Sequence, residues 1–212
     1  MGFPTLIIDN FFDDPDKVVE YANTLEFLPS ELGEWPGKRS EELWMTNPEL
    51  FDYTSAKIYN MFYPHGLEHY KMSLKFQYIE PYSFDNKGWI HIDRSQFGGI
   101  IYLTKDAEMG TGTSLYTPVR GYYRYSMETK KNKRNHYLGK EFDKDEYKKV
   151  RKESNDSFQE NLRVESVYNR LLMFGGNVWH GVPSFGTKPR LTMVFFSQGV
   201  VDNVPEPLLR GA

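Results

Sequence analysis

The chain has 212 residues and no cysteine, which excludes a disulfide framework, a thiolate metal site and a cysteine nucleophile. It has no apolar run of the roughly 18 residues that a membrane span needs, so no membrane partner is expected. The net charge of −3 argues against a general polyanion binder. The start, Met1–Pro4, lacks the basic flank and apolar core of a signal peptide. Together these absences predict a cytoplasmic protein.

Aromatic residues are plentiful, with 15 Tyr and 15 Phe, and broad rings pack well on sheets. Apolar alternation or short apolar runs bounded by turn residues predict strands at 6–12, 73–79, 89–93, 99–104, 113–116, 163–167, 169–174, 178–182 and 190–196. Helical spacing of apolar residues predicts helices over 13–27 and 47–63. We therefore expect a single domain over residues 1–212, mainly β with buttressing helices, folded as a double-stranded β-helix, the cupin-like jelly roll.

One group of residues in these strands has the donor types of a metal site. His91 and Asp93 are two residues apart, so on a strand they point to the same face. His180 lies on a later predicted strand and can supply a second imidazole. Two histidines and one carboxylate on one face, with the opposite positions open, form the facial triad of non-haem Fe(II) oxygenases.

Two other segments leave alternatives open. His65 and His69 have the i, i+4 spacing of helical metal ligands, but Gly66 weakens a helix there, so ordinary loop or surface histidines are the preferred interpretation. Residues 29–40 are predicted as a loop. Within it, 35–40 combines a turn with two cations, which fits a surface turn and a substrate-facing loop equally well.

The segment 120–153 differs from the rest of the chain in charge. It holds 12 Lys and Arg against 6 Asp and Glu, a net charge of +6 that leaves −9 for the remainder. It includes Lys130, Lys131, Lys133 and Arg134, and its end at 143–152 is predicted as a polar helix. A solvated insertion over about 119–163 is the preferred interpretation. A docking surface for nucleic acid or an acidic partner, and a lid or wall over the active site, are the alternatives.

The motifs taken together resemble one superfamily. His91-x-Asp93 is followed by His180 and, ten residues later, by Arg190-x-Thr192. This order, with strand-like context around each motif, resembles the 2-oxoglutarate/Fe(II)-dependent oxygenases, and within them the prolyl 4-hydroxylase-like branch. The resemblance covers residues 72–118 and 164–198 well and the N-terminal third loosely.

The resemblance implies a role for each matched residue. His91, Asp93 and His180 would ligate Fe(II). Arg190 would pair with the distal carboxylate of 2-oxoglutarate through two parallel hydrogen bonds, and Thr192 would add a hydroxyl. An aromatic hydroxyl often assists in this family, and Tyr78 and Tyr102 are both candidates here.

The implied activity is that of a dioxygenase, with His91, Asp93, His180 and Arg190 as its catalytic residues. It would use O₂, with ascorbate as a possible reductant, to hydroxylate a C–H bond of a peptide or protein side chain (prolyl-type) or of a small molecule. Two alternatives stay open. A cupin-like metal enzyme without 2-oxoglutarate would leave Arg190 without its role. A non-catalytic jelly-roll module would use segment 120–153 to dock nucleic acid or protein. No sequence feature indicates an oligomeric state.

Overall fold

The computed structural model describes residues 3–63, 67, 69–82, 84–119 and 126–200. The elements, in chain order, are β1 (Leu6–Ile8), α1 (Pro15–Ala22), β2 (Leu28–Pro29), β3 (Lys38–Arg39), α2 (Leu43–Thr46), α3 (Pro48–Tyr59), β4 (Tyr70–Ile79), β5 (Phe97–Tyr102), β6 (Thr113–Pro118), α4 (Met127–Tyr137), α5 (Lys144–Asn155), β7 (Phe158–Val164), β8 (Arg170–Gly175), β9 (Trp179–Gly181) and β10 (Arg190–Val200). None of the described helices is long and apolar enough to cross a membrane.

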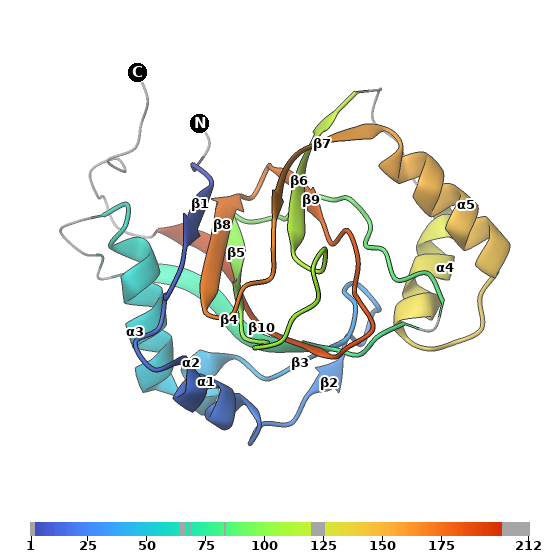
Figure 1. Ribbon diagram of the computed structural model, residues 1–212. Coiled ribbons are helices and arrows are strands. Elements are labelled where there is room, and N and C mark those ends of the chain that lie inside the picture. Colours follow the sequence, from blue (N-terminus) through green and yellow to red (C-terminus); the bar gives the residue numbers. More distant parts are fainter. Residues whose placement is uncertain (1–2, 64–66, 68, 83, 120–125, 201–212) are drawn as a thin grey trace.

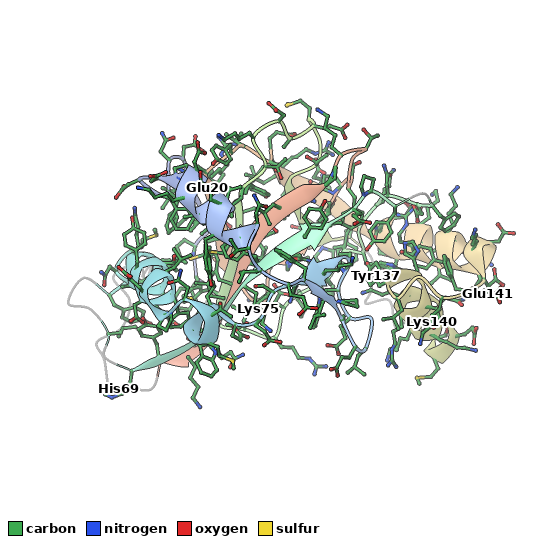
Figure 2. The ribbon with its side chains drawn as sticks, turned by 90° about the horizontal axis from the view of Figure 1, so that it is seen from below. Glu20, His69, Lys75, Tyr137, Lys140 and Glu141 are labelled. Atoms are coloured by element: carbon green, nitrogen blue, oxygen red, sulfur yellow. The ribbon has the colours of Figure 1, made fainter. Side chains whose placement is uncertain are left out.

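The strands form two antiparallel sheets. The larger has the order β1-β8-β5-β10-β4-β3-β2, and the smaller has the order β7-β6-β9. Helices α1 to α3 gather beside the larger sheet, whereas α4 and α5 lie at the other end of the molecule, as Figures 1 and 2 show from two directions. The mainly β jelly-roll class with buttressing helices, predicted from the sequence, is confirmed.

Strand β10 lies in the middle of the larger sheet and separates two environments. It pairs with β4 on one side and β5 on the other. Because side chains alternate along a strand, Leu191, Met193 and Phe195 point into the core shared with the N-terminal helices. Arg190 and Thr192 therefore point to the opposite face, where they line a cavity.

The N-terminal helices begin where the sequence indicates. The Asp14 carboxylate accepts a hydrogen bond from the Lys17 amide, and the Asn47 side chain accepts one from the Leu50 amide at 3.0 Å. Such caps satisfy amides that have no partner within the helix. The predicted helices over 13–27 and 47–63 are therefore present, although both are shorter than predicted.

Several of the sequence-based assignments were wrong in detail. The strand predicted at 6–12 ends at Ile8, and the strand predicted at 163–167 is β7, which begins earlier and ends at Val164. Residues 89–93 do not form a strand; they run extended, with a single β-bridge from His91 to His180. Most of their remaining backbone bonds go to loops and side chains instead of a ladder. In the predicted loop 29–40, Lys38 and Arg39 pair with Tyr78 and Gln77 of β4 and extend the larger sheet.

The basic segment folds mostly as two helices. The polar helix predicted over 143–152 is confirmed as α5, whereas α4 was not predicted. Of the histidine pair considered above, His65 lies outside the described residues. His69 is exposed just before β4, at the edge of the molecule in Figure 2.

Candidate metal centre

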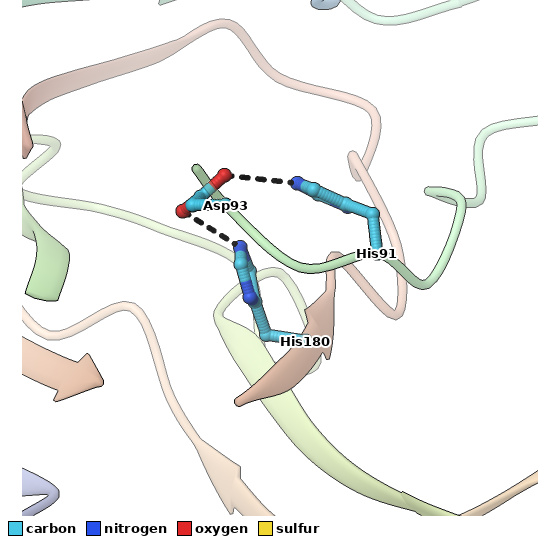
Figure 3. Close-up of side chains that lie close together, drawn as sticks. All are labelled: His91, Asp93 and His180. Carbon is cyan, nitrogen blue, oxygen red and sulfur yellow. Dashed lines mark ion pairs between the residues drawn. The ribbon is translucent and has the colours of Figure 1, made fainter. Parts of the chain in front are cut away.

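The structure brings His91, Asp93 and His180 together, with the Asp93 carboxylate directed to both imidazoles (Figure 3), and all three line the cavity. The distance from His91 Nε2 to Asp93 Oδ1 is 3.7 Å, and from His180 Nε2 to Asp93 Oδ2 it is 3.4 Å. One potential ligand atom from each residue lies within 4.8 Å of the others, and no other such group of three occurs among the described residues. Octahedral ligands at about 2.1 Å from a metal lie roughly 3 Å apart, so the three side chains need only small shifts to hold one ion.

Both imidazoles are oriented by main-chain carbonyls. His91 Nδ1 lies 2.9 Å from the Trp89 carbonyl oxygen, and His180 Nδ1 lies 2.9 Å from the Val178 carbonyl oxygen. A carbonyl only accepts, so each Nδ1 carries the proton and donates it. Each Nε2 therefore offers a lone pair toward Asp93, which is the arrangement that metal-binding histidines adopt.

The charge state of His91 also suits a ligand. Loss of solvation in the cavity, and then interaction with His180 and Lys133, hold the pKa of His91 well below its usual range, even though 49% of its side chain is exposed. The neutral form therefore dominates at neutral pH, and the neutral imidazole is the form that binds a metal.

Close backbone contacts fix the segment that carries the first two residues. His91 and His180 exchange both main-chain hydrogen bonds, at 2.9 and 2.8 Å, and the Asp93 amide donates to the Gly176 carbonyl at 3.1 Å. A Cβ at Gly176 would lie 1.9 Å from the Ser95 carbonyl oxygen, so only glycine allows this approach. The turn after β8 thus helps to position Asp93.

Helix α5 supports the same segment from outside. The Trp89 indole donates to the Tyr147 hydroxyl at 3.0 Å. The Asn155 side chain accepts from the Ile90 amide at 3.2 Å and donates to the Gly88 carbonyl at 2.9 Å. A buried ion pair between Arg151 and Asp85 adds a further link. Since these bonds flank His91, the predicted insertion contributes to the positioning of a candidate ligand.

The cavity has a volume of about 570 Å³, and Arg190 lies in its wall. Only 4% of Arg190 is exposed, yet its Nε and Nη1 atoms have no hydrogen-bond partner. Thr192, two residues along the same strand face, directs its hydroxyl to the Gln77 carbonyl at a long 3.4 Å. Unpartnered buried donors cost about 1–3 kcal/mol each, so this wall favours an anion that would accept from them.

The two tyrosine candidates lie on opposite faces of the sheet. Tyr102 is opposite Thr192 in the register, is buried, and donates to the Thr113 hydroxyl at 2.9 Å. Burial raises the pKa of Tyr102, so its hydroxyl keeps its proton. Tyr78 is opposite Leu191 and packs against Phe27, away from Arg190. The structure therefore brings Tyr102, and not Tyr78, to the Arg190 face.

Two cations of the cavity wall were not among the predicted site residues. Arg39, on β3, stacks on the Trp35 ring with its guanidinium carbon 4.4 Å from the ring centroid. Lys133, on α4, has its ammonium 5.6 Å from the centroid of Trp89. The sequence signals were the two cations in the turn at 35–40 and the basic run at 130–134. Neither signal indicated which cation points inward.

Solved structures that resemble this chain belong to one class of protein. HygX from Streptomyces hygroscopicus, with nickel and 2-oxoglutarate bound, gives a TM-score of 0.56 at 12% identity over 98% of this chain and 90% of its own. A prolyl hydroxylase from Trichoplax adhaerens, in complex with a hypoxia inducible factor peptide fragment, gives 0.52 at 14% identity over 92% and 83%. SnoN, an alpha ketoglutarate dependent epimerase from nogalamycin biosynthesis, gives 0.52 at 11% identity over 98% and 86%.

The fold is that of the 2-oxoglutarate/Fe(II)-dependent oxygenases, and prolyl hydroxylases are among the structures that share it, as the resemblance implied. Residues 1–183 match the model of DUF6445, a family of unknown function, and the chain belongs to that family. No curated protein sequence matches the chain.

Proposed function

We propose that this protein is a 2-oxoglutarate- and Fe(II)-dependent dioxygenase, with its whole length forming one domain. The observation that carries the proposal is the arrangement of the candidate triad and Arg190 around one cavity. His91, Asp93 and His180 would hold the metal through three adjacent positions, leaving the others for the co-substrate and O₂.

The donor set and the cavity fit the two absent groups. The triad consists of two imidazoles and one carboxylate, which are ligands that Fe(II) accepts. Arg190 has two buried donors without a partner, and Thr192 beside it has a hydroxyl with only one long hydrogen bond. A carboxylate accepting from these groups would satisfy them, so Arg190 and Thr192 would bind the distal carboxylate of 2-oxoglutarate.

The protein would mainly fix geometry and exclude water. When bound, iron and 2-oxoglutarate supply the activation of O₂, with release of CO₂ and succinate and transfer of one oxygen atom to a substrate C–H bond. The Trp89 and Val178 carbonyls hold both imidazoles with Nε2 toward the ion. The buried hydroxyl of Tyr102 would keep its proton, and Tyr102 is the register partner of Thr192 on the Arg190 face of the sheet.

The proposed reaction is hydroxylation of a protein side chain or of a small molecule. The Trichoplax adhaerens enzyme is in complex with a peptide, and HygX also has a structure with hygromycin B bound. Both kinds of substrate are therefore compatible with this fold, and fold alone does not decide between them.

The test begins with binding. Under anaerobic conditions, Fe(II) and 2-oxoglutarate together should give a charge-transfer absorption that needs both components. Asp93→Ala should abolish it, and Arg190→Met should abolish it at low 2-oxoglutarate. In air, with ascorbate, the protein should release succinate. Absence of both the absorption and succinate release would refute the proposal.

The rival function is a non-catalytic docking module that uses the basic segment. Lys130, Lys133 and Arg134 line the cavity, and this orientation favours the enzyme instead. The module predicts that partner binding survives Asp93→Ala and fails when Lys130, Lys131, Lys133 and Arg134 are neutralised together. The dioxygenase predicts the loss of metal in Asp93→Ala.

A further inference from the structure

The cavity beside the candidate metal centre has more positive than negative side chains in its wall. Apart from Arg190, the cations that line it are Arg39, Arg94, Lys130, Lys133 and Arg134. The acids that line it are Asp93, which is a candidate metal ligand, and Glu34. The excess of positive charge remains after the proposed co-substrate site is set aside.

Arg39 forms no direct ion pair with any residue that the structure describes, although Asp93, Glu42 and Glu34 act on its charge from a distance. Its guanidinium lies over the Trp35 ring and 5.5 Å from the centroid of Phe196. Its Nη2 atom makes one long bond of 3.5 Å to the Gln77 side chain, and its Nε is buried without a partner. Burial lowers the pKa of Arg39 to about 10, and Asp93 is the largest opposing influence, so the guanidinium is close to the metal centre.

Lys133, from α4, lines the same cavity as Arg39 and the candidate metal ligands. Its ammonium lies 5.6 Å from the ring centroid of Trp89 and 5.8 Å from that of Tyr137. Within the ranges that the structure describes, it forms no ion pair. It lines the same cavity as His91, and the ring that it contacts belongs to Trp89, two residues before His91. Burial lowers the pKa of Lys133 to about 8, so it is still mostly charged at pH 7.

Charge balance explains why these cations require another ligand. In the loaded centre, the divalent ion and Arg190 would together neutralise Asp93 and the two carboxylates of 2-oxoglutarate. Of the remaining side chains that line the cavity, Glu34 is the single acid against five cations, Arg39, Arg94, Lys130, Lys133 and Arg134, so an excess of positive charge would remain. Removing a charge from water is costly unless an opposite charge is paired with it.

We propose that the primary substrate carries an oxyanion, a carboxylate or a phosphate, which Arg39 and Lys133 bind beside the metal centre. This inference rests on the proposed dioxygenase function and narrows its substrate class. An arginine held over an aromatic ring and a lysine in the wall of the same cavity suit an oxyanion, because both groups donate charge-assisted hydrogen bonds. It also gives α4 a role, since Lys133 comes from that helix.

The experiment measures anion binding without relying on turnover. The protein is loaded with Mn(II) and saturating N-oxalylglycine, so that the Arg190 site is filled. Calorimetric titrations then use inorganic phosphate and glutarate, with glutaramide as the neutral counterpart. The variants are Arg39→Met, Lys133→Met and Lys133→Arg. Lys131→Met is the matched control, because Lys131 is exposed on the same helix and does not line the cavity.

The expected result is binding of at least one of the two anions and no binding of glutaramide. Arg39→Met and Lys133→Met should each weaken that binding at least tenfold, whereas Lys133→Arg should retain most of it and Lys131→Met should not change it. Preference for phosphate or for glutarate then identifies which oxyanion the substrate carries. The inference is overturned if neither anion binds, or if the anions bind equally to all variants. It is also overturned if Arg39→Met and Lys133→Met weaken N-oxalylglycine binding as much as they weaken anion binding.

Failure of the proposed function would be recognised separately. If N-oxalylglycine does not bind with Mn(II), the co-substrate assignment fails. The anion titration is then repeated in an Arg190→Met background, where the competing cation is absent. If anion binding in that background depends on Arg39 and Lys133, the anion site is supported. If it does not depend on them, the inference is overturned.

Discussion

Replacing Arg190 by methionine should have opposite effects on stability and on ligand binding. The guanidinium is buried, with two donors that have no partner. Apolar replacement of buried charged groups is often neutral or stabilising by about 1–4 kcal/mol. A change of 1 kcal/mol shifts Tm by roughly 2–4 °C in a domain of this size. The ligand-free Arg190→Met variant should therefore melt at the same temperature as the parent or several degrees higher.

The same substitution should nearly abolish binding of 2-oxoglutarate. Two hydrogen bonds to a charged group are worth about 1.5–3 kcal/mol each, so affinity should fall by roughly 10²–10⁴-fold. For the parent with Mn(II), 2-oxoglutarate at 100 times its Kd should add about 2.7 kcal/mol and raise Tm by roughly 5–10 °C. In the variant this rise should disappear at the same concentration.

Thermal denaturation with and without 2-oxoglutarate, in the presence of Mn(II), measures both effects. Arg170→Met is the matched control, because Arg170 is paired with Asp9 by bonds of 2.5 and 2.9 Å. It should lower stability by at most about 1 kcal/mol, since that pair is near the surface, and leave the ligand-induced rise intact. A destabilised Arg190→Met variant that still shows the full rise would refute our interpretation of this residue.

Three further predictions concern the metal centre and the cavity. Asp93→Ala should lose Mn(II) binding in calorimetry while its circular dichroism stays native, and metal affinity equal to the parent's would exclude Asp93 as a ligand. Gly176→Ala should lower the free energy of unfolding by about 1–3 kcal/mol and weaken metal binding, because the added Cβ would meet the Ser95 carbonyl. An unchanged midpoint of urea unfolding would contradict this close approach. Lys133→Met should be more stable than the parent at pH 7. The pKa of Lys133 is about 8 in the folded state, below its ordinary value of 10.5. As the pH rises from about 8 to 10.5, the folded parent loses the buried charge and becomes more stable. The stability advantage of Lys133→Met over the parent should therefore fade by about pH 10.5. An advantage that persists above that pH would exclude titration of Lys133 as its cause.

Much of the architecture could be predicted because its signals are local. The strand predicted at 190–196 is present as part of β10, where Leu191, Met193 and Phe195 face the core and Arg190 and Thr192 face the cavity. Helix α4 was missed because its sequence is polar all around and has no apolar stripe. Lys38 and Arg39 were assigned to a loop because their pairing with β4 is a long-range contact that local composition does not encode.

The candidate site shows the same division. The sequence grouped His91, Asp93, His180 and Arg190 by their order in the chain, and the structure places all four around one cavity. Strand parity could not decide between Tyr78 and Tyr102 until the register was known. The extended run at 89–93 was taken for a strand, yet one bridge and several loop contacts were enough to hold its side chains in place.

The bonds from α5 to the His91 segment affect how this protein can be engineered. The helical hairpin of α4 and α5 stands at one end of the molecule and looks like a module that could be removed. Excision would take away Tyr147, Asn155 and Arg151, on which residues 85–90 depend. Efforts to alter selectivity should therefore vary the inward positions of α4 and keep α5 unchanged, since a shortened chain would lose its metal geometry together with the helices.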